Sequence, residues 1–519
     1  MKMKNTFLII FLLYLACSGS SQVDSNANGK KPNVLFIAVD DLNDWINTNA
    51  WTGRPGIKTP NFKRLAEMSM SFINCEVPSP ACAPSRVAIM TGVHPVKSGI
   101  TGWRHPEWRK VPALQKVETI EQFFKARGYI TLGGGKIYHT LAPPRYIGNQ
   151  SEARGWDFYF PSAQIPIPYQ VRAPKESITI NNVTEIPQPD YFSWGPIPLE
   201  EKYMADYQIV DWANYELSQP HDKPFFLAVG LTKPHDPWEV PQKYFDLYPI
   251  DSIRDVEIKK NDLTDAWNHG RRPLDKFIVD NKQTKKVIQA YMATISFTDA
   301  MLGRLLDGFE KSLYKNNTII VLWSDHGMHM GEKENWEKFT LWERSLRAPL
   351  FFMVPGITEA GSSTHVPVGT IDIFPTLAEL IGEKTPSYCD GESLVPMFKD
   401  KAFNHKPVLS TYELKDSIND KPYDAYTIRT ERYRYIYYPP SGLEELYDHD
   451  IDKNEWNNIA YKPGNNKLII DLRGLLLQQV PNLTWSNNVP KGYKLLEEGT
   501  IQKLNYIPLE YLKQIKWWL

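Results

Sequence analysis

The chain of 519 residues is predicted to be an α/β protein. We expect a large mixed, mostly parallel sheet flanked by helices, and a smaller C-terminal subdomain with an antiparallel sheet. Continuous apolar runs rich in branched residues, typical of strands buried on both faces, alternate with segments of helical periodicity. Near the C-terminus, an alternating aromatic segment precedes a turn signal and a short strand. These patterns predict a leader and tether over residues 1–22, a main domain over 30–400 and a subdomain over 405–519.

The N-terminal segment is interpreted as an export signal. Lys2 and Lys4 precede an apolar run over residues 7–16 that is too short to span a bilayer. Leu15-Ala16-Cys17 resembles a bacterial lipobox, and Ser18–Ser21 would form a flexible polar tether. We therefore expect a lipoprotein anchored through Cys17 in the periplasm or on the outer membrane of a Gram-negative bacterium. A plain secretory signal with an incidental cysteine is the alternative.

Four apolar runs are predicted to be strands, and polar residues follow three of them. Asp40-Asp41 follows the first, Lys233 and His235 follow the second, and Asp325-His326 follows the third. In open α/β sheets, ligands bind at the carboxyl ends of the strands, so a site is expected there. The four runs are residues 34–39, 225–229, 318–323 and 350–354, the last closed by Pro355-Gly356.

Helical periodicity predicts a long core helix over residues 285–313 and another helix over 376–381, after Pro375. An aromatic alternation over residues 426–438 precedes the turn residues 439–442 and a short strand at 446–448. This pattern predicts an antiparallel hairpin in the subdomain. The segment after residue 465 has no interpretable pattern.

The composition is that of an ordinary globular protein. Hydrophobic residues make up 42% and charged residues 23%, and the formal net charge is −1. Such a balance produces no bulk field that would attract nucleic acid. Membrane contact is expected only through the lipid anchor.

The run Cys82-Ala83-Pro84-Ser85-Arg86 is the most informative motif. It has no CxxC partner, which argues against a redox pair or a zinc knuckle. A cysteine at a turn leading into a helix suits a nucleophile, because backbone N–H groups and Arg86 can stabilise negative charge there. The ordinary alternative for an isolated cysteine is a buried structural residue. Other segments of the chain decide between the two.

The run from Cys82 to Gly92 resembles the signature of type I sulfatases, in the alkaline phosphatase superfamily. Together with four further segments it stands in the family's order along the chain, and the resemblance extends over residues 31–458, closest to the iduronate-2-sulfatase-like branch. It implies an alkaline-phosphatase-like fold and a sulfuric ester hydrolase. It also implies that a formylglycine-generating or anaerobic sulfatase-maturing enzyme converts Cys82 to formylglycine. The supporting segments are Asn33–Asn43, Gly135–His139, Ala228–His235 and Ser324–Gly327.

Asp40 and Asp41 are adjacent carboxylates that can reach one ion only if the strand ends there. Together with Asp325 and His326 they suit a hard cation such as Ca²⁺ or Mg²⁺. The resemblance implies one Ca²⁺, with residue 82 as a further ligand. His326 stands where many sulfatases have Asn, although the iduronate-2-sulfatase-like branch has His, and an imidazole could also accept Mn²⁺ or Zn²⁺.

The resemblance assigns the remaining catalytic roles. Lys136 and Lys338 would bind the sulfate, and Arg86 would hold the hydrated formylglycine. His235, with Lys338 as a possible helper, would protonate the departing sugar oxygen, and His139 would take a proton from the second hydroxyl of the formylglycine hydrate. We expect the glycines at 133–135 to let the backbone beside Lys136 approach a ligand.

The expected substrate is a sulfated oligo- or polysaccharide, with a 2-O-sulfate on a uronic acid or related sugar. Five residues are candidates to bind a carboxylate or to stack on a sugar ring: Trp103, Arg104, His105, Arg271 and Arg272. One alternative is a phosphonate or phosphodiester hydrolase of the same superfamily, and another is a non-catalytic glycan-binding lipoprotein. If Cys82 is modified, Cys75 and Cys389 remain able to pair, and the sequence leaves that open.

Overall fold

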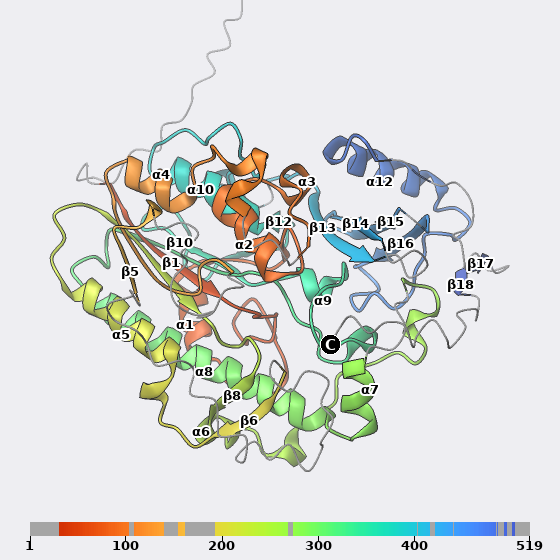
Figure 1. Cartoon of the computed structure of the whole chain (residues 1–519), viewed down its shortest axis with the longest axis horizontal. Coiled ribbons are helices and arrows are strands. Elements are labelled where there is room, and N and C mark those ends of the chain that lie inside the picture. The colour runs from red at the N-terminus through yellow and green to blue at the C-terminus, as the bar shows by residue number, and fades with distance from the viewer. Residues whose placement is uncertain are drawn as a thin grey trace, which may run out of the picture.

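The computed structural model confirms the predicted fold class, with eight strands in one large sheet between two layers of helices (Figure 1). The structure describes residues 31–102, 108–139, 154–160, 192–267, 273–401, 403–415, 421–439, 441–483, 485, 493–495 and 501–503. In order across the sheet, the strands are β11 (Ser363–Thr364), β2 (Met70–Phe72), β10 (Leu350–Met353), β9 (Thr318–Ser324), β1 (Asn33–Val39), β7 (Phe225–Leu231), β4 (Ile130–Gly135) and β5 (Phe158–Phe160).

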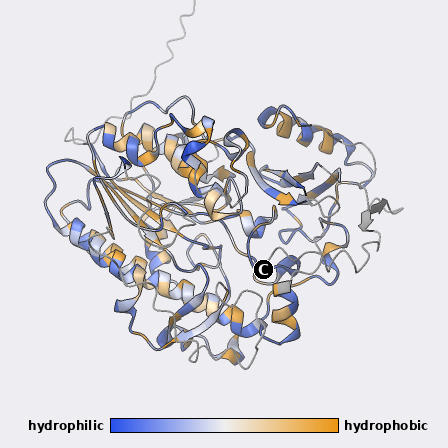
Figure 2. Cartoon of the chain, viewed as in Figure 1, coloured by the Kyte–Doolittle hydropathy of each residue, from blue (hydrophilic) through white to orange (hydrophobic). Residues whose placement is uncertain are grey.

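The sheet is buried on both faces, as the continuous apolar runs predict. Alternate residues of β1 contribute to two separate cores. One core packs against α1 (Pro60–Met68), α5 (Ala205–Ser218) and α8 (Thr284–Lys311), and the other against α2 (Cys82–Thr91), α4 (Ile120–Ala126) and α10 (Ile373–Leu380). Figure 2 shows apolar strands enclosed by helices that carry both apolar and polar residues.

Most neighbouring strands of this sheet are parallel. β1 runs parallel to β7 and β9, and β4 runs parallel to β7 and β5. The run at 350–354 forms β10, which is antiparallel to both of its neighbours. Its carboxyl end therefore lies at the opposite edge from the carboxyl ends of β1, β7, β9 and β4.

A second, four-stranded antiparallel sheet follows in the chain, and its strands pair in sequence order. The predicted hairpin is confirmed by the antiparallel pairing of its two strands, but the second strand begins at Leu443 rather than 446. The alternation over 426–438 spans two strands, with a turn at 430–432. One face of this sheet packs on the segment around Trp342, and the other packs on α12 (Asn466–Gln479), which the sequence did not predict. The strands are β13 (Val408–Lys415), β14 (Pro422–Arg429), β15 (Tyr433–Tyr438) and β16 (Leu443–Asp448).

The long core helix is confirmed as α8. The apolar residues that recur along it with a helical period, Tyr291 among them, form a buried stripe. The predicted start of the next helix is wrong, because α10 begins at Ile373. Pro375 lies in its first turn, where a missing N–H costs nothing. The other elements are β3 (Cys75–Glu76), α3 (Pro95–Ser98), β6 (Trp194–Ile197), β8 (Trp238–Pro241), α6 (Gln242–Phe245), α7 (Pro273–Asp280), α9 (Glu343–Leu346), β12 (Val368–Gly369), α11 (Val395–Lys399), β17 (Tyr493–Leu495) and β18 (Ile501–Lys503).

Cys75, Cys82 and Cys389 are free thiols, so the pair that the sequence left open is not formed. Among the described residues, no helix combines the length and apolar character that crossing a membrane requires. Residues 1–30, which include the predicted lipidation site Cys17, lie outside the described part of the chain.

The glycines before Lys136 pack closely against neighbouring elements, and their expected role beside a ligand stays a prediction. A Cβ on Gly135 would lie 1.9 Å from the carbonyl oxygen of Gly230, and one on Gly230 would lie 2.4 Å from the backbone of Lys136. Hypothetical Cβ atoms on Gly133 and Gly134 would meet the rings of Tyr159 and Trp212. These glycines therefore allow close packing of β4, β7 and α5, and so fix the place where Lys136 leaves the sheet.

We expect Gly230→Ala to lower the free energy of unfolding by about 1–3 kcal/mol, because the added methyl group overlaps backbone that cannot rotate away. Gly474→Ala is the matched control, since a Cβ there meets nothing within 4 Å in the middle of α12. In a helix interior, Ala is favoured over Gly by about 1 kcal/mol, so the control should be neutral or stabilising. Urea unfolding of both variants measures the difference, and equal stabilities would contradict this packing role.

Candidate active site

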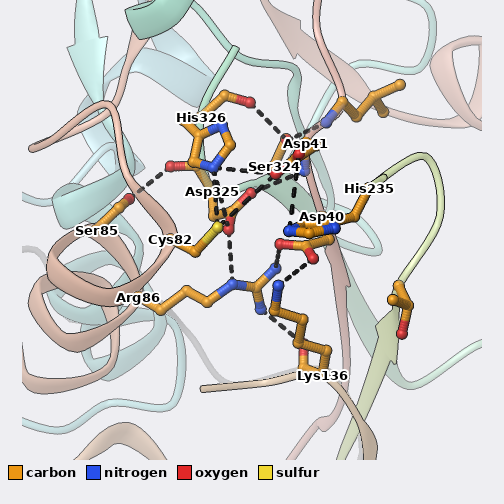
Figure 3. Close-up of polar contacts among 12 residues, drawn as sticks. Asp40, Asp41, Cys82, Ser85, Arg86, Lys136, His235, Ser324, Asp325 and His326 are labelled. Atoms are coloured by element: carbon orange, nitrogen blue, oxygen red, sulfur yellow. Dashed lines mark hydrogen bonds and ion pairs between the residues drawn. The ribbon is translucent and has the colours of Figure 1, made fainter. Parts of the chain in front are cut away.

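Four parallel strands deliver polar side chains to one edge of the large sheet. Asp40 and Asp41 follow β1, Asp325 and His326 follow β9, and Lys136 follows β4. The loop after β7 supplies His235, and the first turns of α2 supply Cys82 and Arg86. Figure 3 shows these side chains pointing toward one another.

Asp40 and Asp41 reach the same cluster because β1 ends before them. Asp41 has a left-handed backbone conformation, with φ of 60°, which breaks the alternation of the strand. Its backbone N–H donates to Asp325 Oδ1 at 3.0 Å, and the Tyr291 hydroxyl donates to its carbonyl oxygen at 2.7 Å. The core helix α8 thus fixes the turn that places both carboxylates.

Arg86 is the cation at the base of the site, and its side chain is fully buried. Its Nε donates to Asp325 Oδ2 at 2.7 Å and its Nη2 donates to Asp40 Oδ1 at 2.9 Å. Its Nη1 donates to the carbonyl oxygens of Lys136 and Ile137 at 2.6 and 2.9 Å. One guanidinium therefore joins the ends of β1, β9 and β4.

The two lysines pair with the two adjacent aspartates. Lys338 Nζ lies 2.7 and 2.8 Å from the carboxylate oxygens of Asp41, and Lys136 Nζ pairs with Asp40. Burial would raise the pKa of Asp40, but Lys136 and Arg86 outweigh it and hold the pKa well below its usual range. Both aspartates are therefore anionic despite full burial.

Cys82 is the first residue of α2 and lies among cations and metal-ligand types. Its Sγ lies 3.2 Å from His326 Nε2, 3.4 Å from Lys338 Nζ and 3.8 Å from Asp41 Oδ1. Burial opposes ionisation, yet Lys136, Lys338 and His326 lower the pKa of the thiol well below its ordinary value. Any oxygen in place of this sulfur would meet the same cations.

The two predicted acid–base histidines lie at this site. His235 Nε2 lies 4.0 Å from Asp41 Oδ2, and His235 Nδ1 lies 3.1 Å from Asp236 Oδ1. Burial lowers the pKa of His235, but Asp236 and Asp41 outweigh it and raise the pKa to about 9. The ring nitrogens of His139 are buried, and burial lowers its pKa, with the Cys82 sulfur partly offsetting that effect.

The donor set fits a divalent metal ion. The ligand atoms of Asp41, Cys82, Asp325 and His326 all lie within 4.8 Å of one another. His326 Nε2 is 3.1 Å from Asp41 Oδ1 and 3.8 Å from Asp325 Oδ2, separations typical of atoms that share one cation. Burial raises the pKa of Asp325 to about 7 even beside Arg86, so a further positive charge would be stabilising.

Sequence reasoning missed the residues that hold this cluster. The Ser85 hydroxyl donates to the Asp325 carbonyl oxygen at 2.6 Å, and Ser324 Oγ accepts from the Leu42 N–H at 3.0 Å. Tyr291 lies in a stripe that the sequence identifies only as core. The partners in these two hydrogen bonds are 240 and 282 residues apart in the sequence, so no local pattern could reveal them. The predicted substrate-binding residues Trp103, Arg104, His105, Arg271 and Arg272 lie outside the described residues.

Two family models match the chain. One, described as sulfatase, matches residues 32–383, and one for the C-terminal part of N-sulphoglucosamine sulphohydrolase matches residues 331–481. A protein named sulfatase from Formosa agariphila is 35% identical over 503 residues, which is 92% of each chain. Human iduronate 2-sulfatase is 27% identical over 501 residues, covering 80% of this chain and 86% of the human protein.

Solved structures share the fold. A protein in complex with its substrate D-glucosamine-2-N,6-O-disulfate has a TM-score of 0.65 at 21% identity, covering 87% of this chain and 98% of that one. A phosphonate monoester hydrolase of Agrobacterium radiobacter has a TM-score of 0.67 at 18% identity, covering 91% of this chain and all of that one. At these identities the likeness establishes the architecture alone.

The metal-site geometry leads to a prediction about stability. Adding Ca²⁺ to EDTA-treated protein should raise the melting temperature, because an ion that binds only the folded state stabilises it by about 2.7 kcal/mol at 100 times its Kd. Asp41→Asn should abolish the calcium-dependent rise, because it removes one of the cluster's carboxylates.

Asp44→Asn is the matched control. Asp44 is a half-buried neighbour that pairs with Arg344 at 2.9 Å and with Arg347, outside the cluster. This variant should be less stable than the wild type yet keep the full calcium response. An undiminished response in Asp41→Asn would place the ion elsewhere.

Proposed function

The chain belongs to the sulfatase family and is a sulfuric ester hydrolase, and we propose that it acts on a sulfated glycan with formylglycine, formed from Cys82, as its nucleophile. The observation that carries the proposal is the environment of residue 82. Cys82 is the first residue of a helix. Its side chain contacts Lys338 and His326 and lies in a buried cluster of carboxylates and cations. A nucleophile there would face an anionic ester held by positive charge.

Asp40, Asp41, Asp325 and His326, with the side chain at position 82, are the residues that would hold one Ca²⁺. When bound, such an ion supplies positive charge that acidifies a hydroxyl beside it and offsets charge on sulfate oxygens. Formylglycine, when formed, supplies a hydrated aldehyde with one hydroxyl to displace the sugar oxygen from sulfur and a second that lets sulfate leave. A formylglycine-generating or anaerobic sulfatase-maturing enzyme would supply the modification.

The other residues have separate tasks in this proposal. Lys136 and Lys338 bind sulfate oxygens, because Lys338 Nζ lies 3.4 Å from Cys82 Sγ and both ammonium groups lower the pKa of that thiol. His235 gives a proton to the departing sugar oxygen from Nε2, the nitrogen that faces the cluster. His139 takes a proton from residue 82 so that sulfate can leave. Arg86 holds Asp40 and Asp325 in place and helps to keep the pKa of Asp40 low.

For the substrate, we propose a 2-O-sulfated uronic acid or related sugar. The similarity to iduronate 2-sulfatase over most of both chains supports this choice. The candidate sugar-binding residues lie outside the described residues, so the sugar has to be identified by measurement. Export and a lipid anchor at Cys17 complete the proposal and agree with a polymeric substrate that is met outside the cytoplasm.

The first test concerns residue 82. Protein produced with a formylglycine-generating enzyme should show a mass decrease of about 18 Da on the peptide that carries Cys82, since CH₂SH becomes CHO. It should release inorganic sulfate from disaccharides with a 2-O-sulfated uronic acid. Cys82→Ala should show neither property, whereas Cys389→Ala, a second cysteine of the main domain, should keep both.

Full turnover by protein with an unmodified Cys82 thiol would refute the formylglycine mechanism. Faster hydrolysis of a phosphonate monoester than of any sulfate ester would favour the alternative enzyme class, whose fold is shared. No turnover of either ester by fully modified protein would favour a glycan-binding role.

A second test concerns the proton donor. An alkoxide departing from a sugar needs a proton, whereas 4-nitrophenolate leaves readily without one. His235→Ala should therefore lower kcat/KM for the sulfated sugar by about 10²–10⁴-fold more than for 4-nitrophenyl sulfate. Equal losses on both substrates would mean that His235 only positions sulfate, and Lys338 would then be tested by the same comparison.

A further inference from the structure

We propose that Asp236 is a positioning residue that orients the imidazole of His235, so that Nε2 of His235 faces the departing sugar oxygen. This inference rests on the proposed function of His235 as the proton donor. It concerns a residue outside the cluster around Cys82 and outside the set predicted from the sequence. Figure 3 shows His235 on its loop after β7, directed toward Asp41.

The contacts of the His235 ring divide between its two nitrogens. Nδ1 lies 3.1 Å from Asp236 Oδ1 and 2.5 Å from the Asp236 carbonyl oxygen. Nε2 lies 4.0 Å from Asp41 Oδ2, on the side of the cluster. Two acceptors on one residue therefore hold the Nδ1 proton, which leaves Nε2 as the nitrogen available for proton transfer.

The backbone around this pair is held by other residues. Both carboxylate oxygens of Asp206, near the start of α5, accept from the N–H groups of Thr232 and Lys233, at 2.9 and 2.8 Å. The buried Lys233 ammonium donates to the carbonyl oxygen of His235 at 3.2 Å and to that of Pro237. The loop is thus fixed without the Asp236 carboxylate, which is left to act on the ring.

The low exposure of the His235–Asp236 pair distinguishes it from an ordinary surface ion pair. The side chain of His235 is 23% exposed and that of Asp236 is 17% exposed, so water competes weakly for the contact. A carboxylate that fixes the tautomer and rotation of a functional imidazole typically changes activity by about 10–100-fold when removed. The loss of activity should therefore appear only with a substrate whose leaving group needs the proton from Nε2.

The experiment compares two substrates in the full-length, matured enzyme. Asp236→Ala should lower kcat/KM for the sulfated disaccharide by about 10–100-fold and for 4-nitrophenyl sulfate by less than about threefold. Asp236→Asn keeps an oxygen acceptor for Nδ1. Its kcat/KM for the disaccharide should therefore fall less than that of Asp236→Ala. Unchanged melting temperatures for both variants would show that folding is intact.

Asp206→Asn is the matched control, because Asp206 supports the same loop through the N–H groups of Thr232 and Lys233. Loosening the loop should lower the melting temperature of this variant, a change that the Asp236 variants should not share. A loss in Asp236→Ala that is equally large on both substrates would show a merely structural role and overturn the proposal. Unchanged kinetics on both substrates would also overturn it.

A double-mutant cycle separates this inference from the proposed function. If Asp236 acts through His235, adding Asp236→Ala to His235→Ala should not lower kcat/KM for the disaccharide any further. The same fractional loss in both backgrounds would overturn the positioning role while leaving His235 as the proton donor. Equal losses on both substrates in His235→Ala alone would remove the proton-donor role and the inference with it, whereas dependence on Cys82 would still establish the sulfatase mechanism.

Discussion

The site depends on one buried guanidinium. Arg86 holds Asp40 and Asp325 through two charge-assisted hydrogen bonds and binds two carbonyl oxygens after β4. Three carboxylates in a dry pocket would otherwise repel one another and take up protons. Because removing one partner of a buried pair costs about 3–5 kcal/mol, this clamp also ties catalytic geometry to folding. The strand ends can meet here only because β1, β4, β7 and β9 are parallel.

The small subdomain braces the same site from outside. Arg434 on β15 is fully buried and pairs with Glu76 at 2.9 Å, with Glu455 at 2.7 Å and with Glu343. Glu76 lies six residues before Cys82, and Glu343 lies five residues after Lys338. A single arginine of the second sheet therefore anchors both segments that deliver residue 82 and the lysine beside it. The second sheet thus helps to hold these two segments in place.

The sequence predicts the parts of this architecture that depend on local pattern. Buried strands appear as apolar runs, and the polar residues after them mark the sheet edge where Asp40, Asp325 and His235 lie. Glycines have the same sequence signal whether they admit a ligand or a neighbouring element, so the close packing of Gly133–Gly135 could not be predicted. The contacts of Ser85 and Tyr291 join segments more than 200 residues apart, which no local pattern reveals. In helix α12 the apolar residues are not confined to one face, so the sequence has no clear helical pattern there. Packing against the second sheet determines where this helix lies.

The balance of charge explains why such a site takes an anion. Asp40 and Asp41 are anionic and the pKa of Asp325 is raised to about 7, while Arg86, Lys136 and Lys338 supply three positive charges beside them. The pKa of His235 is raised, so its ring adds positive charge at neutral pH. A bound divalent cation would increase the excess further. An excess of positive charge in a region shielded from water favours a substrate that brings negative charge, and favours it most where that charge grows during bond breaking. A sulfate ester has this property, because electron density moves onto its departing oxygen as the S–O bond lengthens.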